Sequence, residues 1–504
     1  MNFFIYFYIN FLLIYKVDLS HIKIDPHQTI VFGPGLTPNS VYPVQYFFIQ
    51  AVDKNGMNIT SKLDNNIFIV HIDGSGTENR CRIWTQTLNR HDGSFIVRYK
   101  LYEPCSNLKI QISYNNKPVA NSPYISENKQ IYQEECFCPK NNIKEWLKDM
   151  DCPSTYKQID LDLAIFKQIN MSNILDEVKV RFNHPKSESV CHYAIFENNV
   201  YRECFGEYVG FKMFIDAILL SILRKTKMPN VEFFVNLGDW PLEKRAISDN
   251  PLPIFSWCKS DNVRDIVMPT YDITESTLES MGRVTLDMLS VQQNSGVPWK
   301  NKTEKAIWRG RDSRLERLQL ITLSRQNSHL LDAAITDFFF FRDKISEYGP
   351  RVNHMSFFDF FKYKYQVNVD GTVAAYRFPY LLGGGSAVFK QDSQYYEHFY
   401  NDLQPMVHYI PFKRDLNDLI KTLQWALEND DEVRKIAENG KKFVQENLMP
   451  KDIYCYYAIL LKKFSSLLQE SPVINEKMEL VSQPESSKSA CDCPKIKKTE
   501  KDEL

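Results

Sequence analysis

Three short segments of the sequence combine residue types that could bind and activate a phosphate ester. The first is Gly238-Asp239-Trp240-Pro241, which follows an apolar run over residues 231–237 that is typical of a buried strand. Glycine lets the chain turn and proline ends the strand, which leaves Asp239 where a carboxylate can accept a hydroxyl proton as a general base. On this segment alone, a helix cap or a turn aspartate is the favoured alternative.

The second segment, residues 306–317, carries four arginines: Arg309, Arg311, Arg314 and Arg317. We expect a strand that enters a turn at Gly310 and continues into a helix. Guanidinium groups that converge on the start of a helix suit a diphosphate, because they supply paired donors and positive charge. A solvated basic helix face, paired with Asp312 and Glu316, explains the pattern equally well.

The third segment, residues 370–377, follows another strand pattern. Gly371 gives access to the backbone, Thr372 can cap a helix, and Arg377 lies about one turn further along. The glycines at 383–385 would end that helix before the next strand. A capped core helix is as good an interpretation as a phosphate site. The sequence has no GxGxxG and no GxxxxGK[ST] motif, which disfavours hydride transfer and ATP hydrolysis.

Other chemistries find little support. The sequence contains no HExxH, GxSxG or CxxC motif, which disfavours protease, lipase and disulfide-isomerase activity. The pairs Asp149/Asp151 and Asp160/Asp162 are interpreted as surface carboxylates, so no metal site is predicted. With 61 Lys+Arg against 62 Asp+Glu, the net charge of −1 argues against nucleic acid as a partner.

The elements that must position these segments form two blocks. Residues 20–130 alternate short strands with turns, which predicts an all-β sandwich. Residues 156–470 alternate strands with helices, which predicts an α/β region with parallel sheets in two doubly wound halves. Between the blocks, residues 131–155 hold Cys136, Cys138 and Cys152, interpreted as a Cys-rich linker with disulfides.

The ends of the sequence suggest a compartment. Residues 1–17 have the apolar core of a signal peptide, with an N-terminal anchor as the alternative, and no later run is long enough to span a membrane. Residues 471–504 are expected to form a flexible tail that ends in KDEL, which predicts retention in the endoplasmic reticulum lumen by the KDEL receptor. That lumen is oxidising, so the 11 cysteines are candidates for disulfides, and their odd number leaves at least one thiol free or paired outside the chain. Three N-x-[ST] sites are candidates for glycosylation: Asn58, Asn170 and Asn301.

Several motifs together make the sequence recognisable. NLGDWP (236–241), AIWRGRDSRLER (306–317), KYKYQVNVDGTVAAYRFPYLL (362–382), LQPMVHYIPFK (403–413) and the terminal KDEL resemble the Rumi-type protein O-glucosyltransferases, in their KDEL-containing branch. DGSFIVRY (92–99) and NSPYI (121–125) resemble a filamin-type immunoglobulin-like repeat. The resemblance implies a GT-B fold with two Rossmann-like halves and an inverting reaction that needs no metal or other cofactor. It also implies UDP-glucose as donor, UDP-xylose as a second donor, and serine of EGF-like repeats, such as those of Notch, as acceptor.

The resemblance also assigns roles by position. Asp239 matches the catalytic base, and Arg317 and Arg377 match arginines that bind UDP. Four residues match the helix start beneath the diphosphate: Val373, Ala374, Ala375 and Tyr376. Arg309, Gly310 and Arg311 are assigned to the same donor site. Cys455 matches a half-cystine tied to the Cys-rich linker, with Cys136, Cys138 or Cys152 as its partner.

The acceptor side departs from the shorter family members at residues 203–208 and 271–282, so the choice of EGF repeat and of serine stays open. Glu207 and Trp240 are assigned to the acceptor side. One rival hypothesis is a non-catalytic luminal binding or quality-control protein that works through the filamin-like block. Another is a transferase that uses a different sugar or a glycan acceptor.

Overall fold

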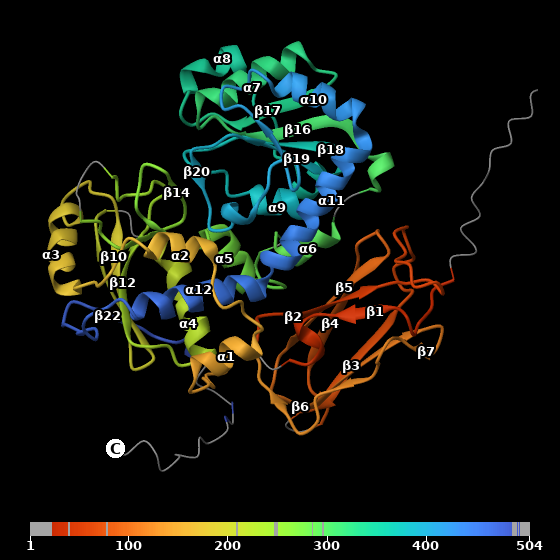
Figure 1. Cartoon of the computed structure of the whole chain (residues 1–504), viewed down its shortest axis with the longest axis horizontal. Helices are drawn as coiled ribbons and strands as arrows, with labels where there is room; N and C mark the ends of the chain where they lie inside the picture. The colour runs from red at the N-terminus through yellow and green to blue at the C-terminus, as the bar shows by residue number, and fades with distance from the viewer. Residues whose placement is uncertain are drawn as a thin grey trace, which may run out of the picture.

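The computed structural model describes residues 23–38, 41–76, 79–207, 210–245, 250–284, 286–294 and 297–485, together with Cys491 and Cys493. These residues form a β-sandwich and two α/β halves that pack against one another (Figure 1). The expected signal peptide and the KDEL sequence lie outside the described residues. Within the described ranges, no helix is long and apolar enough to cross a membrane.

The N-terminal sandwich consists of two antiparallel sheets. One sheet contains β1 (Ile30–Phe32), β2 (Gln45–Gln50), β5 (Ser94–Leu101) and β4 (Ile83–Asn89). The other contains β3 (Ile69–Ser75), β6 (Cys105–Tyr114), β7 (Lys117–Pro118), β8 (Tyr124–Ile125) and β9 (Gln130–Ile131). Phe47, Phe95 and Tyr99 are fully buried between the sheets, and Cys81–Cys105 adds a disulfide. The all-β sandwich predicted from alternation is confirmed.

The first α/β half is built on a six-stranded sheet of order β15-β13-β12-β10-β11-β22. Its strands are β10 (Val190–Phe196), β11 (Asn199–Phe205), β12 (Val231–Asn236), β13 (Ile254–Ser256), β15 (Ile266–Val267) and β22 (Glu479–Val481). Its helices are α1 (Ile143–Asp149), α2 (Lys157–Leu163), α3 (Met171–Phe182), α4 (Lys212–Lys225), α5 (Tyr271–Leu278) and α12 (Pro450–Ser465). Only β12, β13 and β15 run parallel. The prediction of a parallel sheet is therefore wrong for the other strands, because β10 and β11 form a hairpin over two residues and β22 pairs antiparallel to β11.

The second half is a parallel doubly wound sheet, as predicted, with the order β17-β16-β18-β19-β21. Its strands are β16 (Thr303–Arg311), β17 (Leu331–Asp337), β18 (Tyr363–Asn368), β19 (Ala387–Gln391) and β21 (Ile410–Phe412). Its helices are α7 (Leu315–Gln326), α8 (Ile345–Tyr348), α9 (Phe378–Gly383), α10 (Leu419–Glu428) and α11 (Asp430–Asn447). Together the two halves confirm the expected GT-B type arrangement behind an all-β sandwich.

The chain crosses between the halves twice. It leaves the first half through α6 (Met288–Gln293), and it returns through α11 into α12, which packs on β12 and α5. A short antiparallel pair, β14 (Lys259–Ser260) with β20 (Tyr395–Tyr396), also joins the two halves. The two crossovers and this pair set the cleft between the halves.

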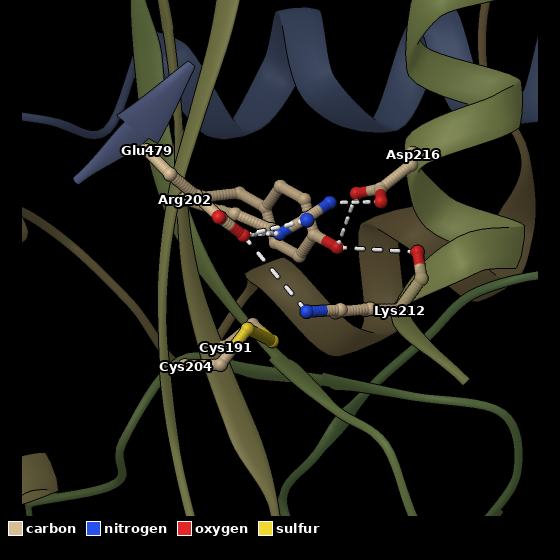
Figure 2. The surroundings of a disulfide bond; sticks show 7 residues. Cys191, Arg202, Cys204, Lys212, Asp216 and Glu479 are labelled. Atoms are coloured by element: carbon tan, nitrogen blue, oxygen red, sulfur yellow. Dashed lines mark hydrogen bonds and ion pairs between the residues drawn. A yellow bond between two sulfur atoms is a disulfide. The ribbon is translucent and has the colours of Figure 1, made fainter. Parts of the chain in front are cut away.

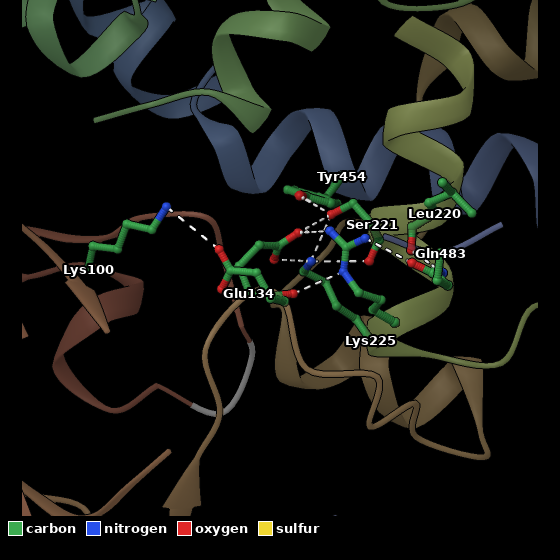
Figure 3. Close-up of polar contacts among 9 residues, drawn as sticks. Lys100, Glu134, Leu220, Ser221, Lys225, Tyr454 and Gln483 are labelled. Carbon is green, nitrogen blue, oxygen red and sulfur yellow. Dashed lines mark hydrogen bonds and ion pairs between the residues drawn. The ribbon is translucent and has the colours of Figure 1, made fainter. Parts of the chain in front are cut away.

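The linker before the first half is held by a buried polar cluster (Figure 3). Glu134 accepts hydrogen bonds from Ser221 at 2.5 Å and from Arg224 at 2.6 Å, and it also pairs with Lys225. Tyr454 of α12 hydrogen-bonds Ser221 at 2.6 Å. Because these cations hydrogen-bond Glu134, the pKa of its carboxyl is lowered despite burial. The cluster fixes the linker to α4 and α12.

The predicted flexible tail is wrong for the part of residues 471–504 that the structure describes. β22 adds to the edge of β11, where Arg202 pairs with both Glu479 of β22 and Asp216 of α4 beside the Cys191–Cys204 disulfide (Figure 2). The tail is also bonded to the linker by disulfides Cys136–Cys491 and Cys138–Cys493. Cys152 pairs with Cys455, so the implied tie between α12 and the linker is present.

The remaining cysteine, Cys258, is free and buried, in agreement with the odd number of cysteines.

The position of Asp162 corrects another prediction. It is 1% exposed, accepts a hydrogen bond from Lys259 Nζ at 2.6 Å, and is not a surface carboxylate like Asp160 on the same helix. Positions two apart on a helix point in different directions, so Asp160 faces outward while Asp162 faces the core.

Candidate active site

A cavity of about 230 Å³ lies in the cleft between the two α/β halves. The first half contributes Asp239, Tyr271 and Asp272, and the second contributes Arg317 and the loop 371–377. Carboxylates therefore line one wall and guanidinium groups the other. This arrangement suits a ligand that carries both a reacting hydroxyl and a dense negative charge.

Asp239 lies in a turn whose shape is set by Asn236, the last residue of β12. The Asn236 side chain accepts a hydrogen bond from Gly238 N at 2.8 Å and donates to Trp240 O at 2.7 Å. Downstream, the buried Asp265 carboxylate accepts from the backbone N–H groups of Leu242 and Glu243, both at 2.8 Å. The turn is held on both sides, so the Asp239 carboxylate has a fixed position.

The surroundings of Asp239 make it a stronger base than an ordinary aspartate. Partial burial raises the pKa of its carboxyl, while a hydrogen bond from the Tyr271 hydroxyl to Oδ1 at 3.4 Å acts in the opposite direction. Tyr271 is itself fixed by edge-on contacts with Trp257 and Tyr376. A raised pKa strengthens proton acceptance by this carboxylate.

Arg317 is a buried guanidinium on the opposite wall, with 5% of its surface exposed. It donates to the backbone carbonyls of Asp370 at 2.7 Å, Arg311 at 2.9 Å and Val369 at 3.1 Å, and it stacks over the Trp308 ring. Burial and the nearby Arg377 lower its pKa to about 9, so it stays charged at neutral pH. Arg317 therefore joins the end of β18 to the start of α7 and places a positive charge beside the cavity.

Arg377 approaches the cavity over Gly310. Its guanidinium donates to Arg309 O at 2.5 Å. A Cβ atom added to Gly310 would lie 3.2 Å from the same guanidinium and 2.7 Å from the Trp308 ring. Only glycine leaves room here, so Gly310 allows Arg377 to lie across the strand beside the cavity.

The loop 371–377 is not the helix start that the sequence predicts. Gly371 N donates to Val373 O at 2.9 Å, which closes a tight turn, and α9 begins at Phe378 with Arg377 as its cap. Val373, Ala374, Ala375 and Tyr376 nevertheless line the cavity, as an irregular segment. Because the side chains of Ala374 and Ala375 are small, a ligand can approach the backbone of this segment.

Several predicted site residues lie elsewhere. Arg309 turns away and pairs with Asp332 of β17, and Arg311 is exposed. Glu207 is exposed at a separate depression with residues 183–186, and Trp240 is half exposed and packs edge-on against Tyr395. In the described part of the chain, none of these four side chains belongs to the cavity lining.

Asp272 is a cavity residue that the sequence analysis missed. Asp272 lines the cavity and is exposed to solvent there, although protein surrounds much of its carboxyl. Burial and the neighbouring Glu275 and Asp239 raise its pKa to about 6, while Arg377 acts in the opposite direction. An aspartate in the first turn of α5, after Pro269-Thr270, was the available local signal, but nothing local places that turn beside Asp239.

All three candidate glycosylation sites lie at the surface or near it. Asn58 and Asn301 are exposed. Asn170 is the N-cap of α3, where its side-chain oxygen accepts from Asn173 N at 3.2 Å. That bond uses Oδ1 and leaves the amide nitrogen as the atom that would carry a sugar.

Comparison with known proteins agrees with this architecture. The model of the family described as glycosyl transferase family 90 matches residues 147–502, and that of the filamin/ABP280 repeat matches residues 23–125. Protein O-glucosyltransferase 2 of Danio rerio is 53% identical, over 95% of this chain and 94% of that protein. Human protein O-glucosyltransferase 3 is 48% identical, over 98% and 97%. Human protein O-glucosyltransferase 1 is 32% identical, over 55% and 72%.

Proposed function

The chain belongs to glycosyl transferase family 90, and we propose that it transfers glucose from UDP-glucose to serine hydroxyls of EGF-like repeats. The observation that carries this proposal is the cavity between the halves, with Asp239 on one wall and Arg317 and Arg377 on the other. The names of the most similar relatives support a protein acceptor and glucose as the sugar.

In this reaction the serine oxygen attacks the anomeric carbon of glucose, and the bond between that carbon and the diphosphate breaks. Asp239 accepts the serine proton, and UDP leaves with the electron pair. Attack from the face opposite the leaving group inverts the configuration at the anomeric carbon. The base and the guanidinium groups come from different halves, which suits attack and departure on opposite sides of the sugar.

Arg317 and Arg377 would offset the charge that grows on the leaving diphosphate. Two guanidinium groups supply positive charge at a diphosphate without a metal ion, so we propose a metal-independent reaction with no other cofactor. Asp272, which opens onto the same cavity, would accept hydrogen bonds from hydroxyls of the donor sugar. UDP-xylose, which lacks only the glucose hydroxymethyl group, is proposed as a second donor.

We place the protein in the lumen of the endoplasmic reticulum, with secretory proteins that contain EGF-like repeats and the KDEL receptor as partners. Five disulfides join described residues of the chain, which requires an oxidising compartment. Removal of residues 501–504 should release the protein to the medium if KDEL is its retention signal.

The test is mass spectrometry of a folded EGF-like repeat incubated with UDP-glucose and EDTA. The wild type should add one hexose to a serine, and Asp239→Asn should add at least about a hundredfold less, since general bases contribute about 10²–10⁴ in rate. Asp261→Asn, the same change at an exposed aspartate outside the cavity lining, is the matched control. Equal activity of the Asp239 variant would place the base elsewhere, and transfer that fails only with EDTA would refute metal independence. Binding of UDP without transfer would refute the acceptor class.

A further inference from the structure

The β-sandwich touches the catalytic region at the two crossovers that connect its halves. Arg98 of β5 reaches the start of α6, the first crossover. Asp92, in the turn before β5, pairs with Lys441 of α11, which leads into the second crossover. Figure 1 shows α6 and α11 lying between the sandwich and the second half. One domain therefore contacts both connections at once.

The contact with α6 is a buried ion pair. Arg98, 9% exposed, donates through one nitrogen to both Asp287 oxygens at 3.3 and 3.4 Å and to Ser290 Oγ at 3.1 Å. Asp287, 1% exposed, is also the N-cap of α6, since it accepts from Ser290 N at 3.0 Å. A second bond from Arg98 Nε to Gln86 at 2.8 Å fixes the arginine within the sandwich. The same carboxylate thus caps the N-terminus of α6 and joins this helix to the sandwich.

A second set of contacts joins the sandwich, α6 and α11. Arg90 donates to Gln292 of α6 at 2.7 Å, and Gln292 in turn donates to Lys441 O at 3.4 Å. Lys441 Nζ returns to the sandwich through Asp92 at 2.8 Å. A sandwich docked on one half would move with that half. Helices α6 and α11 both pack on α9 of the second half, and Tyr42 of the sandwich packs edge-on against Tyr454 of α12 in the first half. Because the sandwich contacts elements of both halves, rotation of one half against the other would break some of these contacts.

The crossovers are in turn packed against the cavity wall. A Cβ added to Gly383, at the end of α9, would lie 3.1 Å from Met288 Sδ and 3.2 Å from Val291, so α9 lies directly on α6. At the other end of α9, Arg377 is the N-cap residue. In its middle, the Tyr380 hydroxyl donates to Asp272 O at 3.0 Å. The position of α6 therefore affects both walls of the cavity.

We propose that the β-sandwich braces the hinge between the two catalytic halves, and that Arg98 and Lys441 are positioning residues for the cavity. The proposal rests on the proposed function in one respect: the cleft that the brace controls is the site of glycosyl transfer. The sandwich itself contributes no residue to the cavity lining described above. Its effect on the reaction passes through α6, α11 and α9.

The test compares wild type with full-length Arg98→Met/Lys441→Met. Amide hydrogen exchange over residues 371–383 and 271–278 should become about tenfold faster in the variant, while exchange in β12 and β18 stays unchanged. The kcat/KM for transfer should fall about tenfold, with UDP affinity reduced as well. Lys109→Met, which removes one positive charge from β6 in the other sheet of the sandwich, is the matched control and should behave as wild type.

Faster exchange in α6 alone, with residues 371–383 and kcat/KM unchanged, would overturn the proposal and leave the sandwich as a passive attachment. If the double variant does not fold, Arg98→Lys serves instead. It keeps the charge but loses the planar guanidinium, which binds Gln86 through Nε while a second nitrogen binds Asp287 and Ser290, and it should produce the same changes at smaller size. The exchange readout needs no substrate. If wild type transfers no hexose but exchange responds as expected, the brace stands and the proposed function fails.

Discussion

Arg317 and Arg377 line the same cavity but are held very differently, which predicts different consequences for the same substitution. Arg317 donates to three backbone carbonyls, those of Asp370, Arg311 and Val369. Arg377 donates to one carbonyl among the described residues, that of Arg309. Replacement by lysine keeps the positive charge in both cases. It leaves a single point donor in place of a planar fork.

In Arg317→Lys, one ammonium can serve one of the three carbonyls, so two lose their partner inside the protein. A buried group left without a hydrogen bond costs about 1–3 kcal/mol, so two such groups give a loss of roughly 2–6 kcal/mol in unfolding free energy. For a domain of this size, such a loss lowers Tm by roughly 5–15 °C. In Arg377→Lys the ammonium can keep the bond to Arg309 O, so Tm should change by no more than about 2 °C.

Both substitutions should reduce transfer, because each removes one paired donor from the diphosphate side, and a fall of about 10–100-fold in kcat/KM is expected for each. Scanning calorimetry measures Tm, and UDP release with a folded EGF-like repeat measures kcat/KM. A wild-type Tm for Arg317→Lys would show that its carbonyl contacts carry no stability. Full activity of Arg377→Lys would remove that residue from the donor site.

Two further predictions concern pH. Burial raises the pKa of Asp239 above that of an ordinary aspartate, and burial together with Glu275 and Asp239 raises the pKa of Asp272 to about 6. The value of kcat/KM should therefore be level above pH 7, begin to fall near pH 6 as Asp272 is protonated, and fall further as Asp239 is protonated; a profile without a fall near pH 6 would contradict the role of Asp272 in the cavity. Glu397 is fully buried, and burial raises its pKa to about 8. Folding therefore favours the protonated form of Glu397. The stability that this preference contributes is complete below about pH 4 and is lost as the pH rises through about 8. Glu397→Gln should therefore have the same Tm as wild type at pH 5 and a higher Tm at pH 9, where its unfolding free energy should be greater by up to about 5 kcal/mol. Equal Tm values at pH 9 would show that ionisation of Glu397 in the folded protein has no cost in stability.

Elements with a clear local pattern were predictable from the sequence. The alternation over residues 20–130 predicted the sandwich correctly, and the apolar run over residues 231–237 predicted β12. The helix expected to begin at Thr372 begins later in the structure, and the sequence contained a local signal for that later start. Pro379 is tolerated only in the first turn of a helix, so α9 starts at Phe378 and the preceding residues form a loop.

The arginine segment shows why residue type alone did not define the site. Arg309 and Arg311 lie two apart on β16 and share one face of the strand, whereas Trp308 and Gly310 lie on the other. Arg317 stacks on Trp308, and Arg377 passes over Gly310, so the cavity is on the second face. Strand periodicity could have separated these arginines. The contribution of Asp272 could not be foreseen, because no local pattern places the first turn of α5 beside Asp239.

The position of the loop 371–377 changes the electrostatic account of the cavity wall that carries Arg317 and Arg377, the proposed diphosphate side. Had these residues begun a helix, its aligned peptide dipoles would have supplied part of the positive potential for a diphosphate. In the structure α9 starts only at Phe378 and is one and a half turns long, so that contribution is small. The charge must come from Arg317 and Arg377. The first is fixed by three carbonyls of its own half, and the second by a helix that rests on α6. The position of Arg377 thus depends on the contact between α9 and the crossover helix α6, and through α6 on the β-sandwich.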